Sequence, residues 1–184
     1  MATRAVLVSA FICFATITCV NCDYYSQQDA EELKLEKTTL KFYVHDIHSG
    51  NKPSALLVTR PPVKIGQQAV PFGSVFVIDD QLTEGPDPNS RVIGNVQGLY
   101  VSSGQDELGL VLYADFGFTT GKFNGSSFSI VSRNPFLDRQ REFAVVGGRG
   151  KLRLAHGWAE VATIYWNKTN GDAILKYQVT VYHL

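Results

Sequence analysis

Short runs in which apolar and polar residues alternate recur along most of the chain, and clusters of turn-forming residues separate them. Alternation with a period of two is typical of a strand with one buried face. The pattern predicts nine strands, at residues 40–47, 54–60, 74–81, 92–102, 108–118, 126–134, 141–147, 152–166 and 173–183. No stretch has the 3.6-residue period of a long helix, so the sequence predicts an all-β domain.

The last predicted strand shows the alternation clearly. Leu175, Tyr177 and Val179 fall on one face, whereas Lys176 and Gln178 fall on the other. A sheet of this kind covers its apolar face either by closing into an antiparallel up-and-down barrel or by packing in a sandwich. A barrel is favoured, because closure removes the exposed strand edges through which sheets aggregate.

The N-terminal 22 residues differ from the rest of the chain. Arg4 precedes an apolar stretch that runs from Ala5 to Val20, and the small residues Val20 and Cys22 fit a cleavage site after Cys22. The stretch is shorter than the ~20 residues that a bilayer-spanning helix needs. We therefore expect a secretory signal peptide at residues 1–22, a flexible lead-in at 23–37, and the folded domain at 38–184.

Secretion changes the meaning of two further features. Cys13, Cys19 and Cys22 are the three cysteines of the chain, so the mature protein is expected to have no disulfide and no Cys metal site. Asn124-Gly125-Ser126 and Asn167-Lys168-Thr169 match the N-glycosylation acceptor pattern and fall at predicted turns. We expect at least one of Asn124 and Asn167 to carry a glycan.

Composition narrows the classes of function. The chain is 45% hydrophobic and balances 17 Lys and Arg against 17 Asp and Glu, which excludes a disordered, highly charged protein. No Lys/Arg cluster indicates a nucleic-acid site. The sequence also lacks the G-x-S-x-G, Walker and H-E-x-x-H motifs. Nothing in it predicts a metal ion or another cofactor.

Three short features have residues typical of metal, phosphate or acid sites, but their positions favour a structural role. His45 and His48 lie three apart in a predicted strand and would point to opposite faces, so they predict no shared metal. The run 147–150 is rich in glycine but lacks a following helix, which predicts a turn rather than a phosphate loop. Asp79 and Asp80 are adjacent in a predicted strand and also diverge.

Two charged residues continue apolar stripes. Asp46 follows Phe42 and Val44 at period two, so its carboxyl group would be desolvated and suited to donate a proton. The alternative is that Asp46 only begins a turn. Arg141 shares a face with Phe143, and its guanidinium would hold a phenolate or a carboxylate at the barrel mouth. The alternative is a solvated arginine at a strand end, and the pattern alone favours the simpler explanation for both residues.

Several motifs occur in order along the predicted domain. They are 42–46 (FYVHD), 71–74 (PFGS), 77–80 (VIDD), 93–100 (IGNVQGLY), 123–127 (FNGSS), 133–135 (RNP), 141–142 (RE), 145–148 (VVGG) and 177–181 (YQVTV). Together they resemble the plant dirigent family, and the resemblance runs from about Thr38 to Leu184. It implies an eight-stranded antiparallel barrel with a central ligand cavity, secreted to the apoplast, glycosylated and assembled as a homo-oligomer, either a dimer or a trimer.

The resemblance also implies the kind of chemistry. Family members hold phenolic small molecules, and the best-known members steer the coupling of two coniferyl alcohol radicals, made by a separate oxidase, into one lignan enantiomer. Others, the pterocarpan synthases, dehydrate an isoflavanol and close a ring through a quinone methide. A carrier that only binds small phenolics is a third possibility from another class. None of the three predicts a cofactor, a nucleic acid or a membrane as partner.

Four residues match functional positions of the family or depart from them. Asp46 matches its acid after the histidine of the first strand, Arg141 its cavity arginine, and Tyr100 a cavity tyrosine. Lignan-forming members have a second aspartate where this chain has Asn134, before Pro135. An amide cannot donate or accept a proton at neutral pH. This departure favours chemistry with one acid on a single quinone methide over a two-acid scheme, although the lignan-directing role remains the family's general description.

Overall fold

The computed structural model describes residues 32–61 and 70–184, and the expected signal peptide and most of the expected lead-in lie outside the described residues. One 3-10 turn, η1 (Gly150–Leu152), interrupts a series of nine strands. The strands are β1 (Glu36–Asp46), β2 (Ala55–Thr59), β3 (Val75–Thr83), β4 (Val92–Ser102), β5 (Leu110–Phe118), β6 (Ser127–Asn134), β7 (Gln140–Arg149), β8 (His156–Trp166) and β9 (Ala173–His183).

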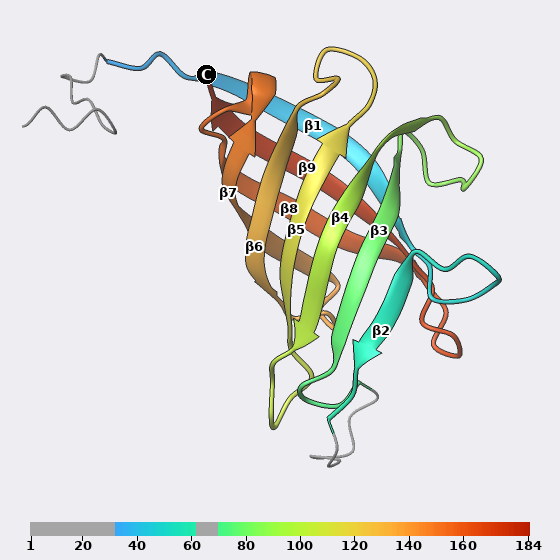
Figure 1. The fold of residues 1–184 in the computed structure, drawn as a ribbon. Coiled ribbons are helices and arrows are strands. Elements are labelled where there is room, and N and C mark those ends of the chain that lie inside the picture. The colour runs from blue at the N-terminus through green and yellow to red at the C-terminus, as the bar shows by residue number, and fades with distance from the viewer. Residues whose placement is uncertain (1–31, 62–69) are drawn as a thin grey trace, which may run out of the picture. The chain divides into compact units, whose positions relative to one another are not determined.

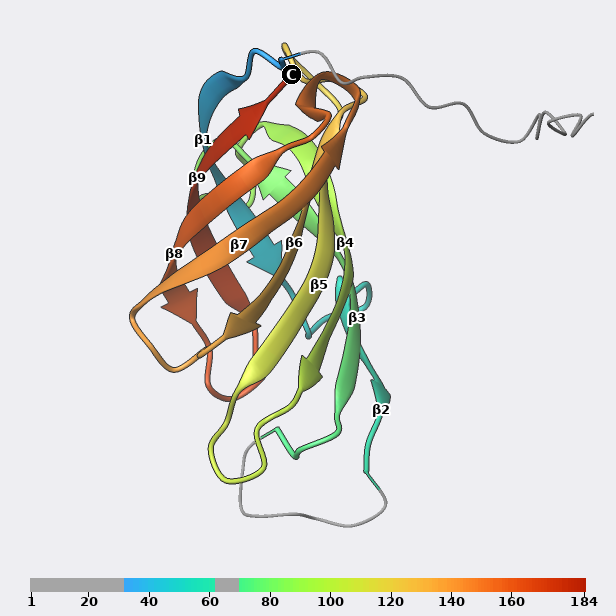
Figure 2. The ribbon, with the colours of Figure 1, turned by 90° about the vertical axis from the view of Figure 1, so that its left-hand side faces the viewer.

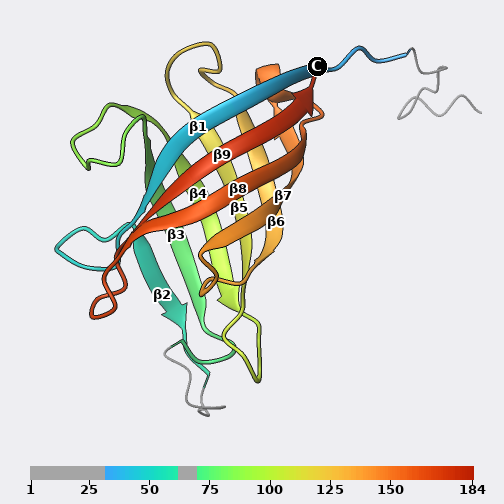
Figure 3. The ribbon, with the colours of Figure 1, turned by 180° about the vertical axis from the view of Figure 1, so that it is seen from behind.

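The strands close into an antiparallel barrel. Consecutive strands from β3 to β9 pair with one another, β9 pairs with β1, and β1 pairs with β3, which closes a ring of eight strands (Figure 1). Figure 3 shows β1, β9 and β8 side by side on the opposite wall. The short strand β2 is extra and pairs only with β3. The all-β, up-and-down barrel is therefore confirmed.

β1 and β2 pair with the same edge of β3, each along a different part of it. His45 of β1 pairs with Gln81 near the end of β3, whereas Ala55 of β2 pairs with Ile78 farther back. The loop between them leaves the sheet and returns, because the amides of Ser54 and Ala55 both donate to the carbonyl of Ile47, at 2.8 and 3.0 Å. The end of β1 therefore lies beside the C-terminal half of β3, and β2 pairs with the remainder of that strand.

Three predicted boundaries are wrong, and the first is the start of β1, which begins at Glu36 rather than at residue 40. The strand expected to end at Gly147 continues to Arg149, so Gly148 lies inside β7, where a Cβ would lie 2.2 Å from the Leu152 carbonyl oxygen. The strand expected from residue 152 begins only at His156. Leu152 instead belongs to η1, where its side chain is fully buried against the barrel.

Aromatic side chains fill one end of the barrel. Phe116 and Phe128 stack with ring centroids 4.9 Å apart, and Phe42 stacks on Tyr177 at 5.5 Å. All four are at most 2% exposed, and burial of each ring stabilises the fold by about 1.5–3 kcal/mol. This end is closed by packing, and the buried charged side chains Asp80 and Arg141 lie toward the other end.

The other end, called here the mouth, collects residues from the whole chain. Because the strands are antiparallel, the ends of β1, β4, β6 and β8 meet the starts of β3, β5, β7 and β9 there. The loops 103–109, 135–139 and 167–172 connect strands at this end, and Figure 2 shows them together at the lower end of the barrel. Within the described ranges, no helix is long and apolar enough to cross a bilayer.

Candidate functional site

Asp46 is the last residue of β1, and its side chain is 18% exposed. Its Oδ1 atom is buried and makes no hydrogen bond, although the Nε2 atom of His48 lies 3.2 Å away. Asp46 is thus more than the first residue of a turn, because its carboxyl group lies among buried groups of the mouth. Its catalytic role remains a prediction.

His48 joins this site, contrary to the expectation from the sequence. β1 ends at Asp46, so His48 lies in the following loop rather than opposite His45 in a strand. Its Nε2 atom lies 3.0 Å from the hydroxyl of Tyr100. Burial lowers the pKa of His48, but the carboxylate of Asp46 and the charge of Asp172 outweigh it, so the pKa lies above its ordinary value. His48 can therefore hold or release a proton near neutral pH.

Tyr100 comes from β4 and is 9% exposed. Its ring stacks on Phe76 with centroids 4.8 Å apart, which fixes the direction of its hydroxyl group. Burial, followed by the charges of Asp46 and Asp80, raises the pKa of Tyr100 far above its ordinary value. Tyr100 therefore stays a neutral phenol that can donate a hydrogen bond.

Asp80 is a member of the site that the sequence analysis missed. It is 2% exposed, and its Oδ1 atom accepts a hydrogen bond of 2.6 Å from the hydroxyl of Ser54. Burial, and then the charge of Asp46, raise the pKa of Asp80 to about 9, so it is protonated at neutral pH. Asp79 does diverge, since it lies on the outer face and accepts a hydrogen bond from Asn95.

Arg141 anchors the opposite side of the mouth. It is 6% exposed, which is incompatible with a solvated arginine at a strand end. Its Nη2 atom donates to Thr163 Oγ1 at 2.8 Å, and its Nη1 atom donates to Asn134 Oδ1 at 3.2 Å and to the carbonyl of Phe136 at 3.4 Å. Its Nε atom is buried without a partner. Asn134, at the end of β6, therefore helps to hold the guanidinium of Arg141 by accepting one of its hydrogen bonds.

The pKa of Tyr177 depends on burial and on charged groups from both sides of the mouth, Arg141 on one and Asp46 and Asp80 on the other. It is 2% exposed on the inner face of β9. Burial raises its pKa, the charge of Arg141 lowers it, and the charges of Asp80 and Asp46 raise it further, with a net increase. The phenol thus responds both to the acids beside β1 and to the arginine of β7. The sequence pattern placed Tyr177 on the buried face but gave no sign of this position.

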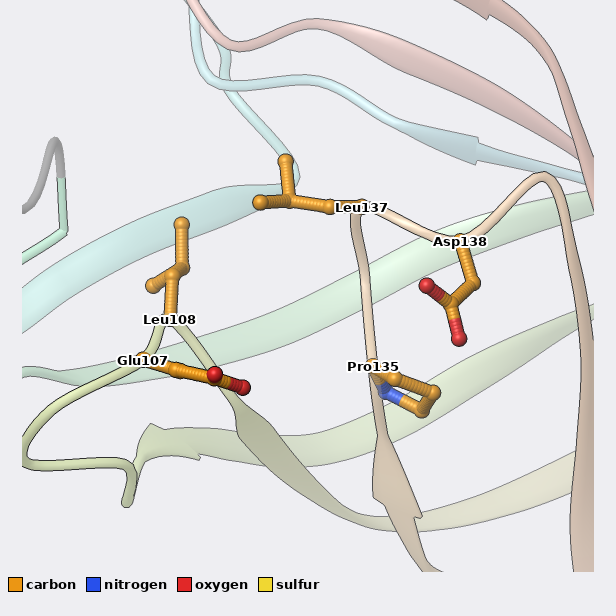
Figure 4. Close-up of a pocket in the computed structure, with 5 residues that line it drawn as sticks. All are labelled: Glu107, Leu108, Pro135, Leu137 and Asp138. Carbon is orange, nitrogen blue, oxygen red and sulfur yellow. The ribbon is translucent and has the colours of Figure 1, made fainter.

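A shallow depression opens on the rim of the mouth, with a volume of about 350 Å³. Glu107 and Leu108 of the β4–β5 loop line one side, and Pro135, Leu137 and Asp138 of the β6–β7 loop line the other (Figure 4). A second depression, of about 450 Å³, lies over β7, β8 and β9, and Arg141 is among the residues that line it. A cavity in the centre of the barrel therefore stays a prediction.

Of the two predicted glycosylation positions, Asn124 lies far from the mouth, whereas Asn167 begins the β8–β9 loop at the mouth end. Asn124 is exposed in the β5–β6 turn at the closed end of the barrel, and Asn167 is half-buried where β8 ends. Their glycosylation stays a prediction. In the described part of the chain, no three His, Cys, Asp or Glu side chains are arranged to hold a metal ion.

The fold and the mouth cluster can be compared with known proteins. A sequence profile described as Dirigent-like protein matches residues 37–182, nearly all of the barrel. The chain belongs to the dirigent family. It is 48% identical over 166 residues to Dirigent protein 15 of Arabidopsis thaliana, covering 87% of each chain. It is also 38% identical over 180 residues to Pterocarpan synthase 1 of Glycyrrhiza echinata, covering 96% of this chain and 95% of the relative.

Solved structures of the family agree with the barrel described above. The pterocarpan synthase dirigent protein GePTS1 superposes with a TM-score of 0.79 at 39% identity, covering 86% of this chain and 99% of that one. The related PsPTS1 gives a TM-score of 0.75 at 42% identity, covering 80% of this chain and 96% of the other. Dirigent proteins and pterocarpan synthases thus both stand among its relatives.

Proposed function

We propose that this dirigent protein binds a phenolic small molecule at the barrel mouth and closes a ring through a quinone methide, as a dehydratase of the pterocarpan-synthase type. The observation that carries the proposal is the acid pair of Asp46 and Asp80. A protonated carboxyl group beside an ionisable one, in a buried site, supplies general acid catalysis at neutral pH. The similarity to pterocarpan synthases supports the same choice.

The proposed reaction needs no oxidant. The acid pair gives one proton, through the more exposed Asp46, to the leaving hydroxyl of an isoflavanol, and the carbon–oxygen bond breaks to release water. His48 takes the proton of the conjugated phenol, whose electrons form the quinone methide. A second phenolic hydroxyl then attacks the electrophilic carbon and returns its proton to the acid pair. His48 returns its proton to the first oxygen, so one water is lost in total.

Two buried polar atoms without partners support binding of a phenolic substrate. Arg141 Nε is a donor without an acceptor, and Asp46 Oδ1 is an acceptor without a donor. Leaving such groups unpaired costs about 1–3 kcal/mol each, which a substrate with a phenolic oxygen and a hydroxyl group would recover. Arg141 and the neutral hydroxyl of Tyr100 would then stabilise the negative charge on the phenolic oxygen.

The test is a comparison of two reactions with the purified protein. One incubation contains an isoflavanol alone, and the other contains coniferyl alcohol with an external one-electron oxidant. We expect the isoflavanol to be dehydrated without oxidant. An enantiomeric excess that appears only with the oxidant would support the stereo-directing role instead. If neither reaction gives a product attributable to the protein, a carrier of small phenolics is the remaining explanation.

A stereo-directing role in lignan formation is the second candidate, and Asn134 offers a way to separate the two. Asn134→Asp should add a further acid on the opposite side of the mouth from Asp46 and Asp80, beside Arg141, whose Nη1 atom already donates to this position. We expect the variant to give a larger enantiomeric excess than the wild type in the coupling of coniferyl alcohol. Chiral chromatography measures this excess, and an unchanged racemic product would contradict the prediction.

We further propose that the secreted protein forms a homo-oligomer through the outer face of β2–β6. One row of cross-strand neighbours on this face is entirely apolar, namely Leu56, Val77, Leu99, Tyr113 and Val131. Tyr113 is 45% exposed and Val77 46%. Exposed apolar patches of this kind often mark association surfaces.

A charge in this row should disrupt the oligomer. Tyr113→Lys is expected to shift the protein toward monomers in light scattering coupled to size-exclusion chromatography, because a lysine would have to be desolvated in the contact. Gln97→Lys is the matched control, since Gln97 lies on the same face in the neighbouring polar row, paired with Asp79 and Asp115. Identical masses for the wild type and Tyr113→Lys would place the contact elsewhere.

A further inference from the structure

The β8–β9 hairpin reaches over the loop that carries His48. The Oδ1 atom of Asp172 accepts hydrogen bonds from the backbone amides of His48 and Ser49, at 2.8 and 3.0 Å. Its Oδ2 atom accepts two more, from Ser49 Oγ at 2.6 Å and from Asn170 Nδ2 at 2.8 Å. One carboxylate therefore ties the β1–β2 loop to a hairpin more than a hundred residues later in the chain.

Gly171 gives the imidazole of His48 the room it needs. A Cβ at this position would lie 3.3 Å from the Cγ and Cδ2 atoms of the His48 ring, tighter than an ordinary contact. Its φ of +91° also lies in the region that favours glycine. The hairpin is itself held by hydrogen bonds of 2.8 Å from the amide of Asn167 to the Asp172 carbonyl and from Gly171 to the Asn167 carbonyl.

His48 is therefore held from two sides. On the barrel side its ring lies against Phe76, with centroids 5.5 Å apart, and its Nε2 atom lies within 3.2 Å of both Asp46 Oδ1 and the Tyr100 hydroxyl. On the outer side, Asp172 accepts a hydrogen bond from the His48 amide, and Gly171 packs against the imidazole ring. Without the outer contacts, a side chain on a loop would sample several rotamers and lose its distance to the acid and the phenol.

We propose that Asp172, together with Gly171, is a positioning residue that holds His48 between Asp46 and Tyr100 and keeps it ready for proton transfer. The inference rests on the proposed function for its effect on catalysis, but not for its effect on His48 itself. The hydrogen bonds of Asp172 go to the loop that carries His48 and not to Asp46 or Tyr100, so it acts through the histidine. A misplacement of about 1 Å at a reacting group can reduce a rate by ~10²-fold.

The charges around His48 support the same assignment. The ionisable groups that face it are Asp46 on β1, Tyr100 on β4 and Asp172 on the hairpin. Partial burial tends to raise the pKa of Asp172, but hydrogen bonds from Ser49, His48 and Asn170 outweigh it and keep the carboxyl group ionised. Its negative charge helps to keep the pKa of His48 raised. Removal of this charge should therefore make His48 a weaker base.

The experiment uses Asp172→Asn in the full protein and follows the His48 ring by NMR titration without substrate. The four histidines are assigned with single His→Gln variants. We expect the pKa of His48 to fall, kcat for the isoflavanol to drop roughly tenfold or more, and KM and the melting temperature to change little. Asp115→Asn is the matched control, because Asp115 is a surface carboxylate that accepts one hydrogen bond from Ser129.

Ser49→Ala is the second variant, since it removes one hydrogen bond but keeps the charge of Asp172. It should lower kcat less and leave the pKa of His48 raised, and it carries the test if Asp172→Asn does not fold. An unchanged His48 titration in Asp172→Asn would overturn the inference. If the wild type turns over no isoflavanol, the proposed function fails, whereas the titration still decides whether Asp172 positions His48.

Discussion

Replacing Asp46 by asparagine is expected to reduce dehydration of the isoflavanol by about 10²–10⁴-fold, the usual contribution of general acid catalysis. Asparagine keeps the volume of the side chain but has no proton to transfer. The fold should persist, because an amide oxygen can still accept from His48 Nε2, which lies 3.2 Å from Asp46 Oδ1. Initial rates at saturating substrate and thermal unfolding of the same preparations measure the two effects.

Asp79→Asn is the control for this substitution, since Asp79 lies on the outer face, one residue from Asp80, and bonds only to surface groups. Its activity should equal that of the wild type. If Asp46→Asn keeps both its melting temperature and its product formation, with isoflavanol and with coniferyl alcohol plus oxidant, Asp46 has no role beyond ending β1.

Asp80→Asn is expected to change the dependence of stability on pH. The ordinary pKa of an aspartate is near 3.8, and in the folded protein that of Asp80 is raised to about 9. The folded state then binds this proton more tightly than the unfolded chain, so its contribution to stability is complete below about pH 4 and is lost as the pH rises toward 9. Asparagine resembles the protonated acid at every pH and removes this loss.

Chemical denaturation between about pH 5 and pH 8 measures this effect. The free energy of unfolding of the wild type should fall relative to that of Asp80→Asn by up to about 1.4 kcal/mol per pH unit. The variant should therefore be the more stable protein at pH 8, and it should also lose activity because the acid pair has lost its proton. Parallel stability curves for the two proteins would show that Asp80 is ionised in the folded state.

The strand pattern could be predicted from the sequence because each strand has one buried face and one wetter face. Phe42, Val44 and Asp46 share a stripe, and so do Phe143 and Arg141, which placed both charged residues at the inner face. The error at Gly148 has a physical cause. Glycine usually ends strands, but here it permits the close approach of two backbone segments, a contact that no local pattern reveals.

The rest of the site depends on contacts between distant segments. Asp80 follows Phe76 and Ile78 at period two, the same signal that marked Asp46, but its neighbour Asp79 made the two look like a diverging surface pair. His48 gave no signal, because its partners Tyr100 and Asp172 are 52 and 124 residues away. The loop that carries His48 leaves the sheet and returns, held both by its own hydrogen bonds to Ile47 and by those of its His48 and Ser49 amides to Asp172 of the distant hairpin.

The most direct test of the account is the fate of the leaving oxygen. Purified wild-type protein is incubated without oxygen or any other oxidant with an isoflavanol that carries ¹⁸O in its leaving hydroxyl group, and the product is analysed by mass spectrometry. We expect a ring-closed product lighter by one water and free of ¹⁸O, with the label recovered in solvent water. Absence of product under these conditions, or a ring that retains ¹⁸O, would contradict it.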